Sequence, residues 1–410
     1  MKLLHTSDWH LGKDLYKHKR YDEYQQFLKW LLEIIEQEKI DTLLIAGDIF
    51  DTTTPSNKAQ ELYYRFLADA SIRYCRNIIV IGGNHDSPSF LNAPKEVLKA
   101  LNVFVIADAN DNIEDEIIVL KDENEKPEAI VCAVPYLRER DIRKAESSEN
   151  SFDKERAIAE GIKEHYNAVC ATANEIRKNS SDSSIPLIAT GHLFATGGKT
   201  SEKDGVRDLY VGSLGYVNAS IFPEFVDYAA LGHLHIPQIV GGVETIRYSG
   251  SPLQMSFGEK SGNKSVAVVD FSAEETDVSL VSVPTFQRLE QINGDFETIN
   301  SKIEKLKKEN ENIWIEINYT GKEHIFNLKE KLYELTEDSN LEILRIVNKI
   351  FISQIMKSGK ESETLEELTE NEVFQRCLET KNVPKELRHT LINLFNTVVY
   401  EIKNQDANAE

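Results

Sequence analysis

Five short segments rich in Asp, His and Gly interrupt the first 235 residues of this 410-residue chain, and they constrain its fold more than any other feature. In chain order they are Asp8-Trp9-His10, Gly47-Asp48-Ile49-Phe50-Asp51, Gly83-Asn84-His85-Asp86, Gly191-His192 and Gly232-His233-Leu234-His235. The first three follow directly on apolar runs with strand character. Because ligands in open α/β sheets bind beyond the carboxyl ends of the strands, we expect these side chains to meet at one sheet edge.

The first 110 residues alternate short apolar runs with amphipathic stretches. After an opening strand at Leu3-Leu4, the apolar spacing predicts strands at residues 42–46, 78–81 and 103–106. It predicts helices at residues 24–35, 59–70 and 89–101. A β-α-β-α order of this kind indicates a parallel sheet with helices packed on it. Beyond residue 117 the pattern is rich in strands and holds one long helix near residues 158–176.

The length and a change of pattern near Pro284 predict more than one domain. We expect a main domain at residues 1–283, a small α+β module at 284–350, a polar linker at 351–363 and a pair of helices within 364–410. In the last helix, apolar residues form a stripe at Leu387, Leu391, Leu394, Val398 and Ile402. Such a stripe either packs against a partner protein or folds back on its own domain, and the first is favoured because the pair has little core of its own.

The net charge of −21 counts against a nonspecific nucleic-acid binder, because phosphate contacts need Lys and Arg. The objection is partial, since bound divalent cations invert the sign of a local site and a partner subunit can carry a basic groove. A basic cluster, Lys13, Lys17, Lys19 and Arg20, follows the first motif. It either meets a phosphate backbone or forms a solvated loop.

Cysteine usage and hydropathy indicate a cytoplasmic protein. The four cysteines, Cys75, Cys132, Cys170 and Cys377, are scattered without a Cys-x-x-Cys pair, so neither a zinc knuckle nor a disulfide framework is expected. No apolar run approaches the roughly 18 residues of a membrane span, and the first residues lack the apolar core of a signal peptide.

The residue types in the five motifs suit metal ions. Asp and Asn supply oxygen and His supplies nitrogen, a mixture without thiolate that is typical of manganese, iron or zinc sites. In Asp-x-His and His-x-His, residues i and i+2 of an extended segment lie on the same side and reach one cluster. Each motif alone is common and is often only a turn. All five in order, each at a strand end, favour a metal centre.

The ordered motifs resemble the full signature of the calcineurin-like metallophosphoesterases. The longer strings Thr6-Ser7-Asp8-Trp9-His10-Leu11-Gly12 and Gly83-Asn84-His85-Asp86-Ser87 are similar to those of the bacterial SbcD nuclease family. The resemblance is strong over about the first 260 residues and extends in architecture to the C-terminus. It implies a four-layer α/β/β/α sandwich with a small α+β capping domain that contacts DNA and a C-terminal helix pair.

The resemblance also implies which residues hold metal. One ion would take Asp8, His10, Asp48 and His235, and a second would take Asp48, Asn84, His192 and His233, with Asp48 shared between them and Mn²⁺ as the favoured metal. His85 would stabilise the transition state or protonate the leaving group, unless it is only a hydrogen-bonding neighbour of the ligands. Asp86 would orient the His85 ring. Asp51 stands where eukaryotic and archaeal relatives tend to carry His, so their substrate preferences do not transfer.

The function implied is a metal-dependent DNA exonuclease and endonuclease subunit of an SbcCD-type complex. It would hydrolyse phosphodiester bonds at DNA ends and hairpins in repair, replication and recombination. The expected partner of the helix pair is an SbcC-like SMC-type ATPase. A homodimer through helices at residues 57–70 and 89–101 would complete a heterotetramer. The alternatives are a phosphatase or small-molecule or cyclic-nucleotide phosphodiesterase on the same fold, and a non-catalytic scaffold.

Overall fold

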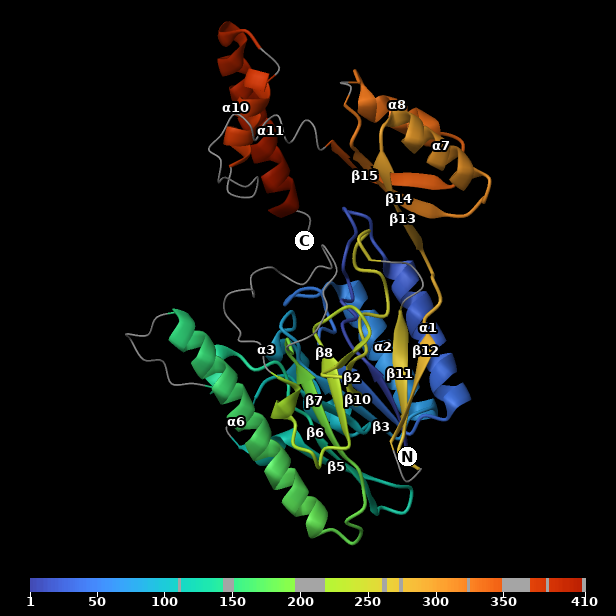
Figure 1. Ribbon diagram of the computed structural model, residues 1–410, viewed down its shortest axis with the longest axis vertical. Coiled ribbons are helices and arrows are strands. Elements are labelled where there is room, and N and C mark those ends of the chain that lie inside the picture. The colour runs from blue at the N-terminus through green and yellow to red at the C-terminus, as the bar shows by residue number, and fades with distance from the viewer. Residues whose placement is uncertain are drawn as a thin grey trace. The chain divides into compact units, whose positions relative to one another are not determined.

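The computed structural model describes residues 1–109, 112–142, 151–195, 218–259, 264–272, 276–322, 325–348, 369–380 and 383–407. The chain divides into two compact units, Met1–Leu289 and Glu290–Glu410 (Figure 1). The linker expected at 351–363 lies outside the described residues. Within the described ranges, no helix combines the length and the apolar composition needed to cross a membrane.

The first unit opens with a six-stranded sheet. Its spatial order is β12 (Asp277–Ser282), β11 (Ser265–Asp270), β1 (Lys2–Thr6), β2 (Thr42–Ala46), β3 (Asn77–Ile81) and β4 (Val103–Ile106). Strands β1 to β4 run parallel, as their alternation with helices predicts, while β11 and β12 are antiparallel additions beside β1. Parallel strands end on the same side, so the first three motifs leave the sheet at one edge.

Helices α1 (Tyr21–Glu38) and α2 (Asn57–Arg73) cover one face of this sheet (Figure 1). The apolar spacing that predicted α1 is the face it buries, from Tyr24 to Ile35. Successive residues of β2 point to opposite faces: Leu43 packs under the helices, and Leu44 points to the other side. Every residue of β2 is therefore buried, which explains its uninterrupted apolar sequence.

The prediction of a single helix at residues 89–101 is wrong. The segment forms two short helices, α3 (Pro88–Asn92) and α4 (Lys95–Lys99), separated at Pro94. Proline has no N–H to donate within a helix, and its ring collides with the carbonyl one turn earlier. Pro94 therefore ends the first helix and serves as the residue before the second.

A second six-stranded sheet follows. Its order is β5 (Ile117–Lys121), β6 (Pro127–Cys132), β7 (Leu187–His192), β8 (Tyr228–Gly232), β10 (Val243–Tyr248) and β9 (Gln238–Val240). Strands β6, β7, β8 and β10 are parallel. The long helix α6 (Ser151–Lys178) packs on its outer face through Ile158, Ile162 and Tyr166.

The two sheets pack on each other through a third apolar core. Leu44 and Ile79 of the first sheet meet residues such as Val131 and Ile188 of the second. The order helix, sheet, sheet, helix confirms the predicted four-layer sandwich. The arrangement also sets the carboxyl ends of β7 and β8 opposite those of β1 to β3, which decides where the five motifs meet (Figure 1).

The second unit begins with a small α+β module. It has three strands, β13 (Arg288–Gly294), β14 (Ile313–Tyr319) and β15 (Leu341–Asn348), and two helices, α7 (Phe296–Lys307) and α8 (Leu328–Thr336). The strand β13 was not expected from the sequence. Two further helices follow, α10 (Glu370–Thr380) and α11 (Lys385–Ala407), whose Phe374 and Phe395 rings stack 4.2 Å apart between centroids.

Candidate metal centre

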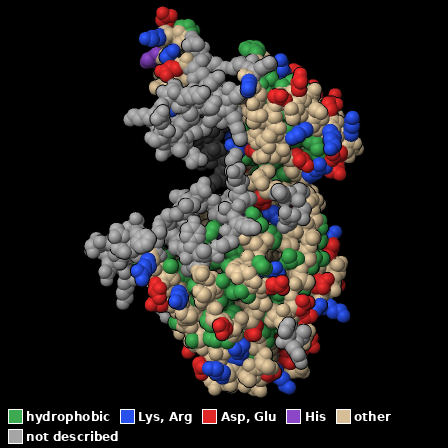
Figure 2. Space-filling model, viewed as in Figure 1, with side chains coloured by type: hydrophobic (Ala, Val, Ile, Leu, Met, Phe, Trp, Pro, Cys, Tyr) green, Lys and Arg blue, Asp and Glu red, His purple; other side chains and the backbone are tan. Residues whose placement is uncertain are grey.

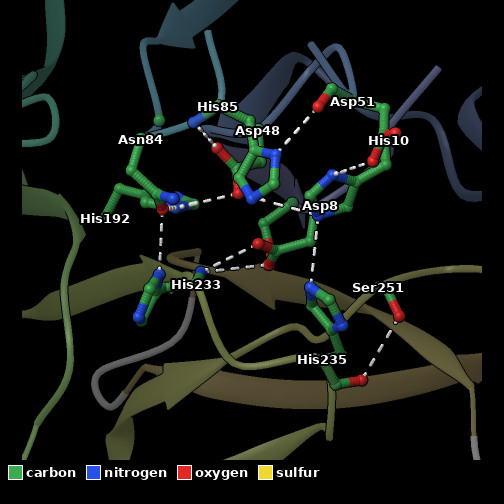
Figure 3. A network of polar contacts seen from close by, with 12 residues as sticks. Asp8, His10, Asp48, Asp51, Asn84, His85, His192, His233, His235 and Ser251 are labelled. Atoms are coloured by element: carbon green, nitrogen blue, oxygen red, sulfur yellow. Dashed lines mark hydrogen bonds and ion pairs between the residues drawn. The ribbon is translucent and has the colours of Figure 1, made fainter. Parts of the chain in front are cut away.

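The motif after β1 and the motif after β2 are joined through their main chains. The Asp8 N–H donates to Gly47 O at 3.0 Å, and the His10 N–H donates to Asp48 O at 3.0 Å. The two loops therefore continue the parallel register beyond the strands, and their acidic and imidazole side chains project from one surface. Figure 3 shows these side chains meeting His192, His233 and His235, which come from the second sheet.

One group of possible ligand atoms lies at Asp8, His10 and His235, within 4.8 Å of one another. The Nε2 atoms of His10 and His235 are 3.2 Å apart and face each other (Figure 3). Both side chains are almost fully buried. Two imidazole nitrogens aimed at the same point are the arrangement expected of two ligands to one ion.

A second group lies at Asp8, Asp48 and His192, again with ligand atoms within 4.8 Å of one another. Asn84 Oδ1 lies 3.0 Å from His192 Nε2 and 3.0 Å from His233 Nδ1. The His192 Nε2 atom also lies 3.3 Å from Asp48 Oδ2. The structure therefore brings together all the residues for which the sequence predicted metal binding.

The chemistry of these donors fits divalent cations. His192 Nδ1 donates to the carbonyl oxygen of Ala46 at 2.9 Å, so in a neutral ring the bare lone pair of Nε2 faces Asp48 and Asn84. Oxygens of a carboxylate and an amide offer that lone pair no proton, whereas a cation satisfies all three atoms. In the described parts of the chain, no Lys or Arg pairs with Asp8 or Asp48 to neutralise them.

The protonation preferences of the site point the same way. Burial alone would raise the pKa of Asp48, but the surrounding imidazoles, led by His192, hold that pKa well below its ordinary range. Burial alone would lower the pKa of His192, but the Asp48 carboxylate outweighs it and raises the pKa to about 9. The site thus attracts positive charge strongly, and without a metal ion a proton supplies it.

Four residues of the site have a left-handed backbone. The φ angles are 54° at Asp8, 48° at His10, 50° at Asp48 and 102° at His233, and none of these residues is glycine. Each such conformation costs on the order of 1–2 kcal/mol for an L-residue. Strain of this kind persists where the surrounding structure enforces it, and here it turns ligand side chains toward one centre.

Two of the glycines before the ligands serve close packing rather than backbone turns. A Cβ at Gly83 would lie 2.2 Å from Asp48 Oδ1, and a Cβ at Gly232 would lie 1.9 Å from Ala46 O. Both glycines have φ angles that other residues also adopt. A backbone turn that favours glycine occurs at Gly47, where φ is 87°. At Gly232 the two sheets approach too closely for a side chain, and at Gly83 the same holds for two neighbouring loops of the first sheet.

His85 lies against the cluster, and its orientation corrects one expectation. Its Nδ1 donates to the main-chain oxygen of Asp51 at 2.8 Å, and its main-chain N–H donates to Asp48 Oδ1 at 2.9 Å. Asp86 does not touch the ring, because its two oxygens accept the N–H groups of Ile49, Phe50 and Gly83. Asp86 therefore ties the second and third motifs together, and the Asp51 carbonyl orients His85.

Asp51 is connected to His10 as well. Its Oδ1 lies 3.4 Å from His10 Nδ1 and accepts a hydrogen bond from Lys13 Nζ at 2.9 Å. Carboxylates on the non-coordinating nitrogen of a histidine ligand fix the ring and increase its basicity. One residue thus positions two imidazoles, His10 through its side chain and His85 through its main chain.

Most of the predicted basic cluster is neutralised by acids. Lys13 pairs with Asp51, Lys19 with Asp14, and the buried Arg20 with Glu23. Lys17 is exposed and has no acidic partner among the described residues. The sequence left open whether this cluster contacts phosphate or forms a solvated loop. Among its four residues, Lys17 is the one best placed to contact phosphate.

Some residues that support the site were missed by the sequence analysis. Ser7 Oγ donates to Asp8 Oδ2 and lies 2.8 Å from Ser249 Oγ, so the loop after β10 is tied to a ligand of the first sheet. Tyr24 OH donates to the carbonyl oxygen of His10 at 2.7 Å. A serine or tyrosine carries no distinctive motif, and only the adjacency of Ser7 to Asp8 offered a signal.

Comparison with known proteins matches both parts of the chain to described families. Residues 1–237 match the calcineurin-like phosphoesterase family. Residues 285–382 match the type 5 capsule protein repressor C-terminal domain. The first match holds all five motifs, and the second begins close to the boundary between the two units.

Several curated relatives are named as the SbcD component of the nuclease SbcCD. The protein of Escherichia coli K12 is 35% identical over 408 residues, which is 99% of each chain. That of Bacillus subtilis 168 is 35% identical over 271 residues, 66% of each chain. That of Staphylococcus epidermidis is 30% identical over 352 residues, 86% of each chain. The first of these similarities runs through both units.

Proposed function

The chain belongs to the SbcD family of calcineurin-like phosphoesterases, and from this premise we propose that it is the metal-dependent nuclease subunit of an SbcCD-type complex. The observation that carries the proposal is the convergence of two carboxylates, four imidazoles and one amide on a single buried cluster. Relatives that are similar over the whole chain carry the name nuclease.

The donor set supports two divalent ions, and we propose Mn²⁺ for both. One would be held by Asp8, His10, Asp48 and His235, and the other by Asp48, Asn84, His192 and His233. Such a pair lowers the pKa of water and neutralises charge on the phosphoryl oxygens during phosphodiester hydrolysis. Mixed nitrogen and oxygen donors without thiolate suit Mn²⁺.

His85 supplies the chain's own proton chemistry in this proposal. Its Nδ1–H is fixed on the Asp51 carbonyl, so Nε2 is the ring atom that remains for the substrate. Burial lowers the pKa of His85, which suits a group that exchanges a proton rather than one that stays charged. We assign to Nε2 the stabilisation or protonation of the leaving oxygen. Asp86 contributes by holding the loops together.

A two-residue hairpin after the first motif supports DNA rather than a small phosphodiester as the substrate. Leu15 and His18 exchange two main-chain hydrogen bonds of 3.0 Å, which places Tyr16 and Lys17 at the tip. The partly exposed Tyr16 ring stacks on Phe257 at a centroid distance of 5.9 Å and an interplanar angle of 18°. Aromatic rings stack on nucleobases, and lysine attracts phosphates.

The acidic net charge does not oppose this proposal. On the face drawn in Figure 2, Lys and Arg side chains lie among Asp and Glu side chains of the described surface. The metal ions would supply positive charge where the scissile phosphate binds.

We also propose, on the strength of the family alone, that the module at 284–350 caps the nuclease domain and contacts DNA.

We further propose that α11 binds an SbcC-like SMC-type ATPase. Its residues Leu387, Leu394 and Val398 recur at helical spacing and are exposed, as expected of an apolar stripe that docks on a partner.

A homodimer through α2 and the α3–α4 segment, where Ile72 and Val97 are exposed, would complete the assembly. Cytoplasmic localisation agrees with the buried Cys75, Cys132 and Cys170, which form no disulfide.

The experiment that tests the proposal uses end-labelled linear duplex DNA. The purified chain with Mn²⁺ should degrade the label, chelation should stop it, and His85→Ala should reduce turnover by at least about 100-fold with metal content unchanged. Bis(p-nitrophenyl) phosphate serves as the small phosphodiester in parallel tubes. Brisk cleavage of the small ester beside intact DNA, with the ATPase partner also present, would contradict the nuclease proposal and favour a small-molecule phosphodiesterase.

A further inference from the structure

A buried lysine lies directly behind the ligand His235. The Lys264 side chain is only 9% exposed. Its Nζ donates to the main-chain oxygen of His235 at 3.0 Å and to Ser251 Oγ at 2.7 Å, and pairs with Glu259 Oε2 at 2.5 Å. The ammonium group thus donates two hydrogen bonds and forms one close ion pair. Because a buried charge costs several kcal/mol unless it is paired, this cluster needs an explanation.

The lysine fastens the main chain that carries the ligand. The oxygen of His235 also accepts the N–H of Ser251 at 3.2 Å. Gly250, with φ of 75°, packs so tightly that a Cβ would lie 2.7 Å from Pro237 and 2.8 Å from His235 O. The loop after β10 and the turn after β8 therefore pack against each other. Lys264 links them, because it donates a hydrogen bond to Ser251 of the loop and another to His235 of the turn.

The glutamate of the pair lies on the far side of the ligand ring. Glu259 Oε1 is 3.9 Å from His235 Nδ1, while His235 Nε2 is 3.2 Å from His10 Nε2. The His235 ring thus lies between the Glu259 carboxylate and the His10 ring. A carboxylate on the non-coordinating side strengthens a histidine ligand, and at this distance it acts through charge rather than through a hydrogen bond.

We infer that Lys264 and Glu259 are positioning residues that set the metal affinity of the group Asp8, His10 and His235. They act on His235 and the loop beside it, whereas the second ligand group is built from β7, the third motif and His233. Both residues lie against His235, so we expect the ion held by this group to be affected most. The inference rests on the proposed function, because it requires that the cluster binds divalent cations.

The test is a Mn²⁺ titration of the full chain followed by electron paramagnetic resonance. Wild type should show the signal of a spin-coupled pair once two equivalents are bound. Lys264→Met should weaken binding of one ion by roughly 10–100-fold, the range found for partners of metal ligands, so single-ion signal persists at two equivalents. Glu259→Gln should weaken the same ion.

The matched control is Arg76→Met, which removes an ion pair with Asp41 and Glu128 at the other end of the first sheet. It should lower stability and leave the coupled signal unchanged. If Lys264→Met fails to fold, Ser251→Ala replaces it, because it removes one acceptor of the ammonium group and should give a smaller loss of the coupled signal.

A coupled signal in Lys264→Met at the wild-type Mn²⁺ concentration would overturn the inference. Equal loss of the signal in Arg76→Met would also overturn it, since the effect would then be general destabilisation. A wild-type chain that never gives a coupled signal would instead refute the two-metal centre of the proposed function. The two failures are therefore told apart in one experiment.

Discussion

At the scale of single residues, the site depends on what surrounds the ligands as much as on the ligands. The predicted ligands could be named from the sequence because Asp, His and Asn at strand ends form a recognisable series. Their supports could not, because Ser7, Tyr24 and Lys264 act through contacts that join segments far apart in the chain. The role expected for Asp86 was wrong for the same reason: adjacency in sequence to His85 did not decide which groups it touches.

Gly83 offers a sharp test of close packing at the residue scale. In Gly83→Ala, the new Cβ would lie 2.2 Å from Asp48 Oδ1 and 2.3 Å from its main-chain nitrogen. Moving Asp48 disturbs a ligand predicted to serve both ions, so we expect metal affinity to fall at least about tenfold and nuclease activity to fall with it. Isothermal titration with Mn²⁺ measures the first effect.

The control for this substitution is Gly242→Ala. Gly242, unlike Gly83, has a left-handed φ, of 76°, and a Cβ there meets nothing within 4 Å. It should cost about 1 kcal/mol of stability through backbone strain alone and leave Mn²⁺ binding intact. Unchanged binding in Gly83→Ala would show that the loops after β2 and β3 tolerate a side chain at this position.

At the scale of elements, long amphipathic patterns were the most predictable. The helix α1 and the strands β2 and β3 follow their apolar spacing closely, because that spacing is the face they bury. The segment at 89–101 breaks at Pro94, where the local rule for proline overrides the apolar pattern. The strand β13 was missed because its polar sequence pairs through the backbone with β14, and only its neighbours reveal it.

The hairpin tip at Tyr16 and Lys17 makes a prediction about substrate. Tyr16→Ala should reduce cleavage of single-stranded DNA roughly tenfold, since stacking on a base contributes about 1–3 kcal/mol, while Tyr16→Phe keeps most of the activity. Cleavage of bis(p-nitrophenyl) phosphate, which needs no base contact, should be the same in all three proteins. Equal losses on both substrates would mean that the hairpin supports the metal site and does not bind DNA.

The stripe on α11 makes a prediction about the partner. Leu394→Glu should abolish co-purification with the ATPase and leave cleavage of the small phosphodiester unchanged, because it places a charge in an apolar contact. Asn396→Glu is the matched control, since this exposed residue lies on nearly the opposite side of the helix from Leu387. If Leu394→Glu bound the ATPase as wild type does, another surface would have to serve as the interface.

At the scale of the whole molecule, the four-layer order explains why a site can form from motifs spread over more than 200 residues. The two sheets pack face to face, and each delivers its ligands from the carboxyl ends of parallel strands. This architecture followed from the sequence through the family resemblance, whereas periodicity alone predicted only a parallel sheet with helices.

We propose that two metal ions in this cluster act together on DNA. The most direct measurement titrates metal-free chain with Mn²⁺ and follows the degradation of end-labelled linear DNA against the equivalents bound. We predict little activity at one equivalent and a steep rise to a plateau at two. Full activity at one equivalent would rule out a two-metal nuclease, as would intact DNA with both ions bound and the ATPase partner present.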